Sequence, residues 1–228
     1  TSHKGSSSLL QNGVEVGFES YIPVKMIVSP CLRWPQKTME ISKIHMNLKA
    51  FDGFCEKFSS LVASAFKNQP YMNGYSPSAV MESLKKSKKE DYIRNLFQHW
   101  PGKNSNCCDN PIRFYKDSLV ENNGWLDRLS DLSRAIDNSD AILLPMVVEA
   151  KEELLQERGL YVAKRNIAIT LFLIDTTSGK LIWSKSRRAE AVNRSLGEKT
   201  TLFPAWNEVE SKVLSKVLFR GFPGKINH

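Results

Sequence analysis

The sequence lacks a hydrophobic run long enough to cross a membrane. A spanning helix needs about 20 predominantly apolar residues, and no such run occurs in the 228 residues. The longest apolar stretches have the length of β-strands. The sequence therefore predicts no membrane-spanning helix. Hydrophobic residues (41%) and charged residues (25%) are both present at levels that support a folded core rather than a disordered chain.

The common nucleotide-binding and hydrolytic motifs are also missing. There is no G-x-G-x-x-G, no G-x-x-x-x-G-K-[ST], no G-x-S-x-G and no H-E-x-x-H. Only four histidines occur, at His3, His45, His99 and His228, and they are far apart. We interpret them as solvated or structural side chains. The sequence thus predicts no catalytic residue, no cofactor and no metal site.

Acidic side chains give only weak candidates for acid–base or metal chemistry. Glu152 and Glu153 are adjacent, and Asp127 and Asp131 have the i, i+4 spacing of one helix face. We interpret both pairs as solvated surface. Asp175 closes a predicted strand before a turn, and we expect it to accept hydrogen bonds from the turn backbone rather than to bind a metal.

Cysteine is scarce, and its spacing does not fit a zinc site. The four cysteines are Cys31, Cys55, Cys107 and Cys108, with no C-x-x-C pair. In an oxidising compartment Cys31 could pair with Cys55, or either could pair with a member of the adjacent pair; in the cytosol all four would be thiols. A redox or hydrolytic enzyme that uses Cys107 or Cys108 stays open as an alternative.

Positive charge exceeds negative charge. There are 32 lysines and arginines against 24 acidic residues, a net charge of +8, which favours anionic partners without selecting one. The basic residues form two clusters that we treat as a candidate surface for such a partner: Lys85, Lys86, Lys88 and Lys89, and then Lys185, Arg187 and Arg188. A solvated charged face is the simpler interpretation. If functional, the clusters suit anionic lipid or glycan. A nucleic-acid-binding module, which would need stackable aromatic side chains among the charges, is a further alternative.

The first half of the chain is predicted to form short strands and amphipathic helices. Residues 22–28 alternate like a strand, and 44–48 could form a second, short strand. Asp52 is predicted to cap a helix whose apolar stripe runs over 54–66.

Further helices follow in the middle of the chain. Ser76 is predicted to cap one of them, with Pro77 at its first position. Others are expected at about 92–100 and 125–136. We expect the range of about 90–122 as a whole to be an irregular insertion that leaves the core, as a lid or a partner surface.

The second half predicts a hairpin and a terminal helix. Residues 140–149 form an apolar run typical of a strand covered on both faces, and Pro145 indicates an edge or a bulge. Residues 166–175 and 180–188 predict a long hairpin, and 203–218 an amphipathic helix. The predicted fold class is α+β: a mixed, mainly antiparallel sheet of about four or five strands with three or four helices packed on it.

The hairpin and the order of elements resemble a family of bacterial envelope lipoproteins. The strand 169–175 ends in Asp175, small residues and Gly179 follow, and the returning strand ends in Trp183-Ser184. This resembles the hairpin of the curli-secretion-channel-like lipoproteins and of proteins like the amino-terminal domain of the Tol translocation protein. The apolar run from Asp140 and the short helix after Ser76 resemble further steps of that pattern. No pore-forming amphipathic hairpin is evident, so the sequence departs from the family pattern at this point and does not predict a channel.

The resemblance implies a non-catalytic lipoprotein that binds or assembles with envelope components. It implies an outer-membrane-anchored location on the periplasmic or surface side, held by an N-terminal lipid, and a homo-oligomer is compatible with it. Residues 1–20 would then be a flexible tether, although a Ser/Gly-rich start is equally what an expression-tag remnant would leave. Residues 21–228 are predicted to form a single α+β domain.

Overall fold

The computed structural model describes residues 25–33, 48–67, 73–100, 111–119, 123–196 and 203–218. These residues form six strands and six helices. The elements in chain order are β1 (Lys25–Val28), β2 (Leu32–Arg33), α1 (Leu48–Lys67), β3 (Asn73–Tyr75), α2 (Pro77–Lys86), α3 (Asp91–Gln98), α4 (Pro111–Leu119), α5 (Asn123–Ala135), β4 (Ala141–Glu157), β5 (Leu160–Asp175), β6 (Leu181–Leu196) and α6 (Trp206–Leu218).

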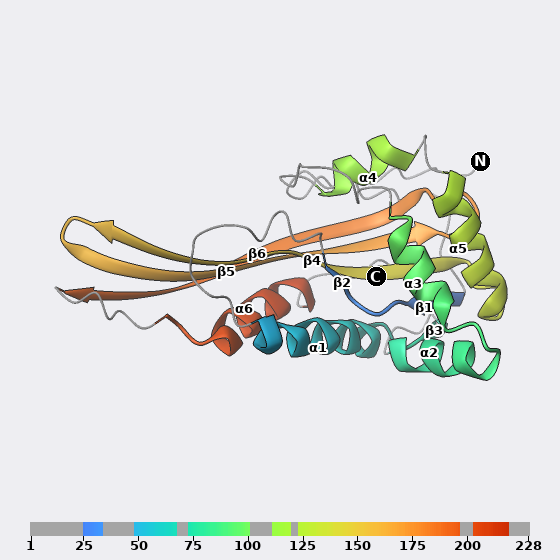
Figure 1. The fold of residues 1–228 in the computed structure, drawn as a ribbon, viewed down its shortest axis with the longest axis horizontal. Coiled ribbons are helices and arrows are strands. Elements are labelled where there is room, and N and C mark those ends of the chain that lie inside the picture. The colour runs from blue at the N-terminus through green and yellow to red at the C-terminus, as the bar shows by residue number, and fades with distance from the viewer. Residues whose placement is uncertain are drawn as a thin grey trace, which may run out of the picture.

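The strands form one mixed sheet in the order β3-β1-β4-β5-β6, and β2 also pairs with β4. The pairs that involve β1 and β2 are parallel, whereas β4, β5 and β6 are antiparallel to one another and contribute most of the ladder. This arrangement confirms the predicted fold class, including the long hairpin and the C-terminal helix after it (Figure 1).

Pro145 lies in β4 opposite Leu171 of β5, but on the other side of β4 it falls between the residues that pair with β1 and those that pair with β2. β1 pairs with β4 as far as Leu143, and β2 resumes at Met146. Between these points the adjacent chain turns away through Ser29 and Pro30. Proline has no N–H to give to a ladder, so this gap tolerates it. The predicted bulge also exists, but it lies slightly later in β4, between Val147 and Glu149.

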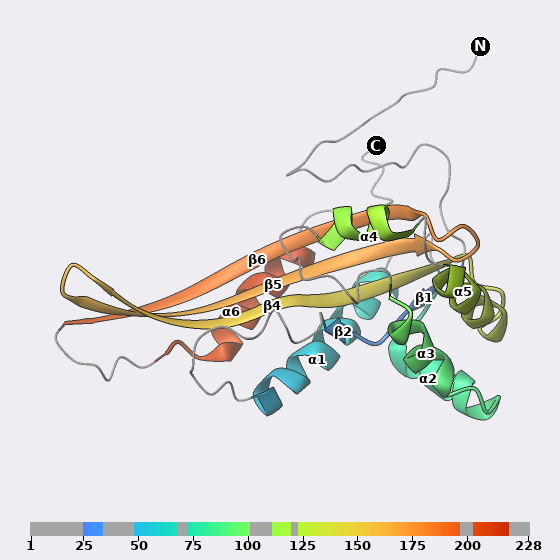
Figure 2. The same ribbon diagram turned by 45° about the horizontal axis from the view of Figure 1, so that its top comes forward.

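The antiparallel strands are longer than predicted. β4 continues to Glu157 and turns through Arg158 and Gly159, whose φ angles of 50° and 81° suit a two-residue hairpin. We predicted a strand only to Glu149 because the residues beyond it are mainly polar. From Leu154 onward these residues are exposed, and this part of the strand extends past the helices, as Figures 1 and 2 show.

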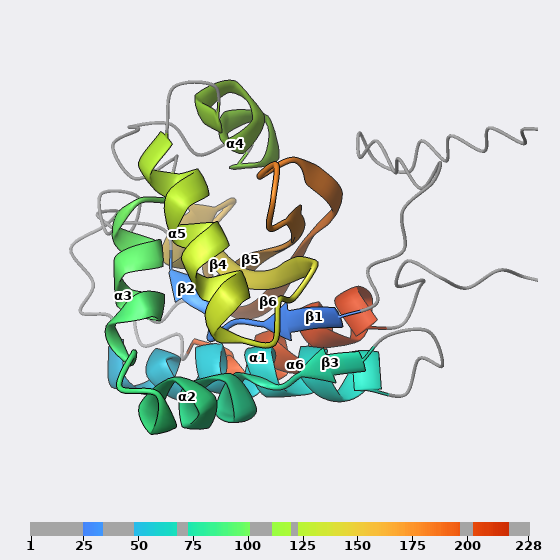
Figure 3. The same cartoon turned by 90° about the vertical axis from the view of Figure 1, so that its right-hand side faces the viewer.

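Helices cover both faces of the sheet, so the sheet has two cores. On one face α1 and α6 pack against apolar residues of β4, β5 and β6 that include Leu143, Leu171 and Trp183. On the other face α3, α4 and α5 pack against residues that include Leu144 and Phe172. Figure 3 shows α1 and α6 below the sheet and α4 above it. The strand 140–149 is therefore buried on both faces, as its continuous apolar sequence predicted.

The insertion predicted at about 90–122 is, in its described residues, more regular and more buried than we expected. It contains α3 and α4, and Leu96, Trp100 and Tyr115 are buried in the second core. The Tyr115 hydroxyl donates to the Gly179 carbonyl at 2.6 Å and accepts from the Trp125 indole at 2.9 Å. Because these bonds join α4 to α5 and to the β5–β6 turn, α4 belongs to the folded body and is not a detached lid.

Two predictions about the start of the first helix also need comment. The N-cap at Asp52 is wrong, because α1 begins at Leu48 and Asp52 lies inside it. Leu48 is helical, so it does not belong to the predicted strand 44–48, whose other residues lie outside the described part of the chain. The tether predicted at 1–20 also lies outside it.

Candidate functional site

A basic corner joins α2 to α3, and its backbone is well fixed. The Ser76 hydroxyl accepts from the Ala79 amide at 3.2 Å, which confirms the predicted cap of α2. At the other end Lys88 adopts a left-handed conformation (φ 57°), and the Lys89 amide donates to the Leu84 carbonyl at 2.8 Å. Leu84 is fully buried. The lysines of the corner therefore project from a rigid support.

The four lysines of this corner lie at the surface. Lys85, Lys86 and Lys88 are exposed, and Lys89 is partly exposed. Lys86 pairs with Glu82 at 2.7 Å, and the Lys89 ammonium lies 5.5 Å from the centre of the Tyr92 ring. Neither Lys85 nor Lys88 makes an ion pair with a described residue. The structure thus keeps the first predicted cluster together and accessible.

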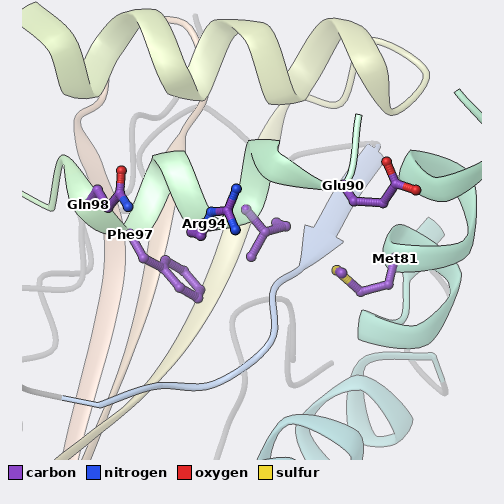
Figure 4. A pocket seen from close by; sticks show the side chains of 6 residues that line it. Met81, Glu90, Arg94, Phe97 and Gln98 are labelled. Atoms are coloured by element: carbon purple, nitrogen blue, oxygen red, sulfur yellow. The ribbon is translucent and has the colours of Figure 1, made fainter. Parts of the chain in front are cut away.

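An open groove of about 430 Å³ lies beside the corner, between α2 and α3. Its apolar surface comes from Met81, Ile93 and Phe97, and polar side chains at Glu90, Arg94 and Gln98 complete the lining (Figure 4). Met81 is 37% exposed, which is unusual for a large apolar residue in this protein. Methionine is flexible and polarisable, so it adapts to apolar partners of different shape.

A second groove lies on the other side of Met81 and is bordered by a disulfide. Cys31 and Cys55 are bonded, with 5.4 Å between their Cα atoms, which joins the β1–β2 connection to α1. This is one of the pairings that the sequence left open. The groove measures about 680 Å³ and is also lined by Ser59, Ser78 and neighbouring residues. Cys107 and Cys108 lie outside the described residues.

The second predicted basic cluster does not form one surface. Lys185 is 5% exposed, and its ammonium donates to the Val217 carbonyl at 2.8 Å, near the C-terminal end of α6. The prediction that Lys185 belongs to a partner-binding surface is therefore wrong. Burial and the nearby Arg187 lower the pKa of Lys185 to about 8. Arg188 instead pairs with Glu149 at 2.6 Å on β4. Strand alternation separates Arg188 from the other two side chains, a consequence that the sequence already implied.

Sequence reasoning missed a buried ion pair beneath the start of α6. Arg165 donates to Glu152 at 2.7 Å, and the Glu152 side chain is only 6% exposed. The guanidinium also donates to the Pro204 carbonyl at 2.6 Å and lies 4.7 Å from the Trp206 ring centre. Glu152 is thus no solvated residue, contrary to our interpretation, whereas its neighbour Glu153 pairs with Lys151. The sequence could have predicted this ion pair only if the register had been known, because Glu152 and Arg165 face each other on β4 and β5.

The other candidate residues have local structural partners. Asp175 accepts from the amides of Thr177 and Ser178 at 3.0 and 2.6 Å, which confirms its role in the turn. Asp131 pairs with two arginines of its own helix. His99 bonds the Asn95 carbonyl at 2.7 Å, and His45 lies outside the described residues. Among the described residues no three metal-ligating side chains come together.

The long antiparallel strands β4, β5 and β6 form a three-stranded ribbon, and two leucines are exposed at the end where β4 turns into β5. Beyond the Glu152–Arg165 pair, β4 and β5 run to their turn, and Leu154 and Leu155 are 41% and 38% exposed. Strand alternation puts one leucine on each face of the ribbon. Figure 2 shows that the helices end short of this turn.

No helix in the described part of the chain is long and apolar enough to cross a membrane.

Comparisons with known proteins give similarities at the level of solved structures. No protein-family model and no curated protein matches the sequence. Lipoprotein GNA1162 from Neisseria meningitidis is similar at 16% identity and a TM-score of 0.40, over 86% of this chain and 96% of that one. The PelC dodecamer from Paraburkholderia phytofirmans is similar at 11% identity and a TM-score of 0.33, over 86% and 85%. The hypothetical protein CT253 from Chlamydia trachomatis is similar at 10% identity and a TM-score of 0.37, over 85% and 95%. Since all three TM-scores are below 0.5, we transfer no property of these proteins to this chain.

Proposed function

We propose that this chain is a non-catalytic binding protein of a bacterial envelope, held at the outer membrane by an N-terminal lipid, that assembles with other envelope components through its projecting ribbon. The observation that carries the proposal is the ribbon itself. Strands of this length span about 55 Å, and the last part of β4 and the first part of β5 extend past the helices (Figure 1). Leu154 and Leu155 are exposed at this tip, one on each face of the ribbon, where a partner could cover them.

The disulfide supports a location in the cell envelope. Disulfides persist in the periplasm and outside the cell, whereas cytosolic thiols are kept reduced. Cys31 and Cys55 are bonded and border a groove. The envelope resemblance of the hairpin agrees with this, because Asp175 and Trp183 have the turn-closing and buried positions that the pattern requires.

Site-specific photo-crosslinking in intact cells tests the assembly role. A photoreactive amino acid replaces Leu155 at the ribbon tip, and a control variant carries it at the exposed Asn207 on α6. We expect a defined crosslinked band from position 155 that is absent from position 207 and that weakens when Leu154 is changed to serine. Identical patterns at both positions, or none at either, would contradict an assembly role for the tip.

The compartment is tested separately. The full gene product is expressed in its own cells, followed by separation of cytosol, inner membrane and outer membrane and by labelling with radioactive palmitate. We expect the protein in the outer-membrane fraction with label incorporated. Recovery in the cytosol with free thiols at Cys31 and Cys55 would overturn the envelope assignment.

A further inference from the structure

We infer that the corner between α2 and α3 is a docking surface for an anionic phospholipid bilayer. The inference rests on the proposed function, since it supplies a second contact with the membrane for a chain that a lipid already tethers there.

Charge is the first argument. Residues 81–94 contain five cationic side chains and three acidic ones, a net charge of 5 − 3 = +2. Lys86 is paired with Glu82, and Arg94 with Asp91. The remaining excess comes from Lys85, Lys88 and Lys89 against Glu90, and these lysines crowd the end of α2 and the turn after it. These lysines present their charge to anything that approaches the corner.

Geometry places an apolar group among these charges. Met81 and Lys85 are four residues apart on α2, and therefore lie on the same face of the helix. Met81 projects into the groove that Phe97 lines from α3 (Figure 4). A flat anionic surface can meet the lysines while Met81 enters the headgroup layer.

The position in the molecule favours a membrane over a second copy of the chain. Figure 1 shows α2 and α3 at the opposite end of the long axis from the β4–β5 turn. A bilayer under the corner would leave the ribbon tip directed away from the membrane, free to reach a partner. A second copy that met this corner through a two-fold axis would present the same cations to it, so that like charges would face each other.

Vesicle binding tests the inference. The full chain, without any lipid, is mixed with vesicles of phosphatidylcholine alone or with 30% phosphatidylglycerol, and the bound fraction is measured by sedimentation. We expect binding only to the anionic vesicles and a steep loss as salt is raised, because screening shortens the reach of charge to about 8 Å at physiological ionic strength.

Matched variants locate the surface. Each lysine near an anionic membrane contributes roughly a fivefold factor in partitioning, so Lys85→Gln with Lys88→Gln should weaken binding about 25-fold. The control, Lys180→Gln with Lys212→Gln, removes the same charge from exposed positions elsewhere and should change binding less than twofold. Met81→Ser should weaken binding a few-fold with the salt dependence unchanged. Circular dichroism verifies that each variant is folded.

The outcomes separate this inference from the proposed function. Equal losses in the two double variants, or a single-stranded oligonucleotide that binds the parent chain more tightly than the anionic vesicles, would refute the docking surface. If the anchored protein crosslinks at Leu155 in the envelope while the lipid-free chain ignores anionic vesicles, the inference fails and the function stands. If vesicles bind but the protein is cytosolic in cells, the function fails and the surface stands.

Discussion

At the scale of single residues, a partly buried ion pair adds to the apolar packing that attaches the C-terminal helix. Arg165 lies between Glu152 on β4 and the Pro204–Trp206 segment that leads into α6. A charged pair at such low exposure is stable only when each member keeps its partner. The pair therefore links the sheet to the start of α6.

Removal of one member of this pair should destabilise the fold. Glu152→Gln leaves the partly buried Arg165 guanidinium without its counterion, and we expect up to about 3 kcal/mol less free energy of unfolding. Urea denaturation followed by tryptophan fluorescence measures it. The control Glu208→Gln, in an exposed pair with Lys212, should cost less than about 1 kcal/mol. Similar losses in both variants would contradict this link.

Lys185 predicts a pH dependence of stability. Its pKa is about 8 in the folded protein, below the ordinary value of 10.5. Between these values the unfolded chain binds more protons than the folded one, so the free energy of unfolding should rise as pH increases from about 8 to 10.5. Lys185→Met should remove this rise, which thermal or urea unfolding at several pH values would reveal. The same rise in the variant would assign it to another group.

At the scale of elements, the disulfide links the parallel edge of the sheet to α1. It closes a separation of 24 residues between Cys31 and Cys55. A disulfide that closes a loop of this size stabilises the folded state by about 3 kcal/mol, mainly because it reduces the conformational entropy of the unfolded chain. Since β1 and β2 are short, this crosslink contributes to their attachment.

Replacement of both cysteines tests this contribution. Cys31→Ser with Cys55→Ser should lower the free energy of unfolding by about 3 kcal/mol, measured in urea without reductant. Addition of a reductant should lower the stability of the parent chain by a similar amount and leave the double variant unchanged. A parent chain that is insensitive to reductant would show that the bond does not stabilise the fold.

At the scale of the whole molecule, the two ends of the long axis have different surfaces. One end has the lysine corner and the two grooves, and the other has the ribbon tip with its leucines. In the further inference the first end faces the membrane, and in the proposed function the second end faces a partner. The protein then bridges the two.

Substitution at the tip should affect assembly and not folding. Leu154→Ser with Leu155→Ser changes two side chains that are about 40% exposed, so we expect the free energy of unfolding to change by less than about 1 kcal/mol. The assembly formed in envelope extracts, measured by size-exclusion chromatography with light scattering, should lose mass. A large loss of stability would mean that the leucines belong to the core instead.

The sequence alone was sufficient for the fold class and for most of the elements. Continuous apolar runs identified the strand at 140–149, and the turn at Gly179 identified the hairpin, because hydrophobic periodicity and turn chemistry are local properties of the chain. The sequence also identified the Lys85–Lys89 corner, since its lysines are neighbours on one helix end. These features need no knowledge of distant partners.

Only the tertiary structure decided which charged residues are surface and which are core. Lys185 and Arg188 are three residues apart, but one is buried under α6 and the other pairs across the sheet. Glu152 and Arg165 meet because β4 continues eight residues beyond Glu149 and sets a register that polar residues do not reveal. Burial of a polar side chain depends on what packs over it, and that depends on contacts between segments far apart in the sequence.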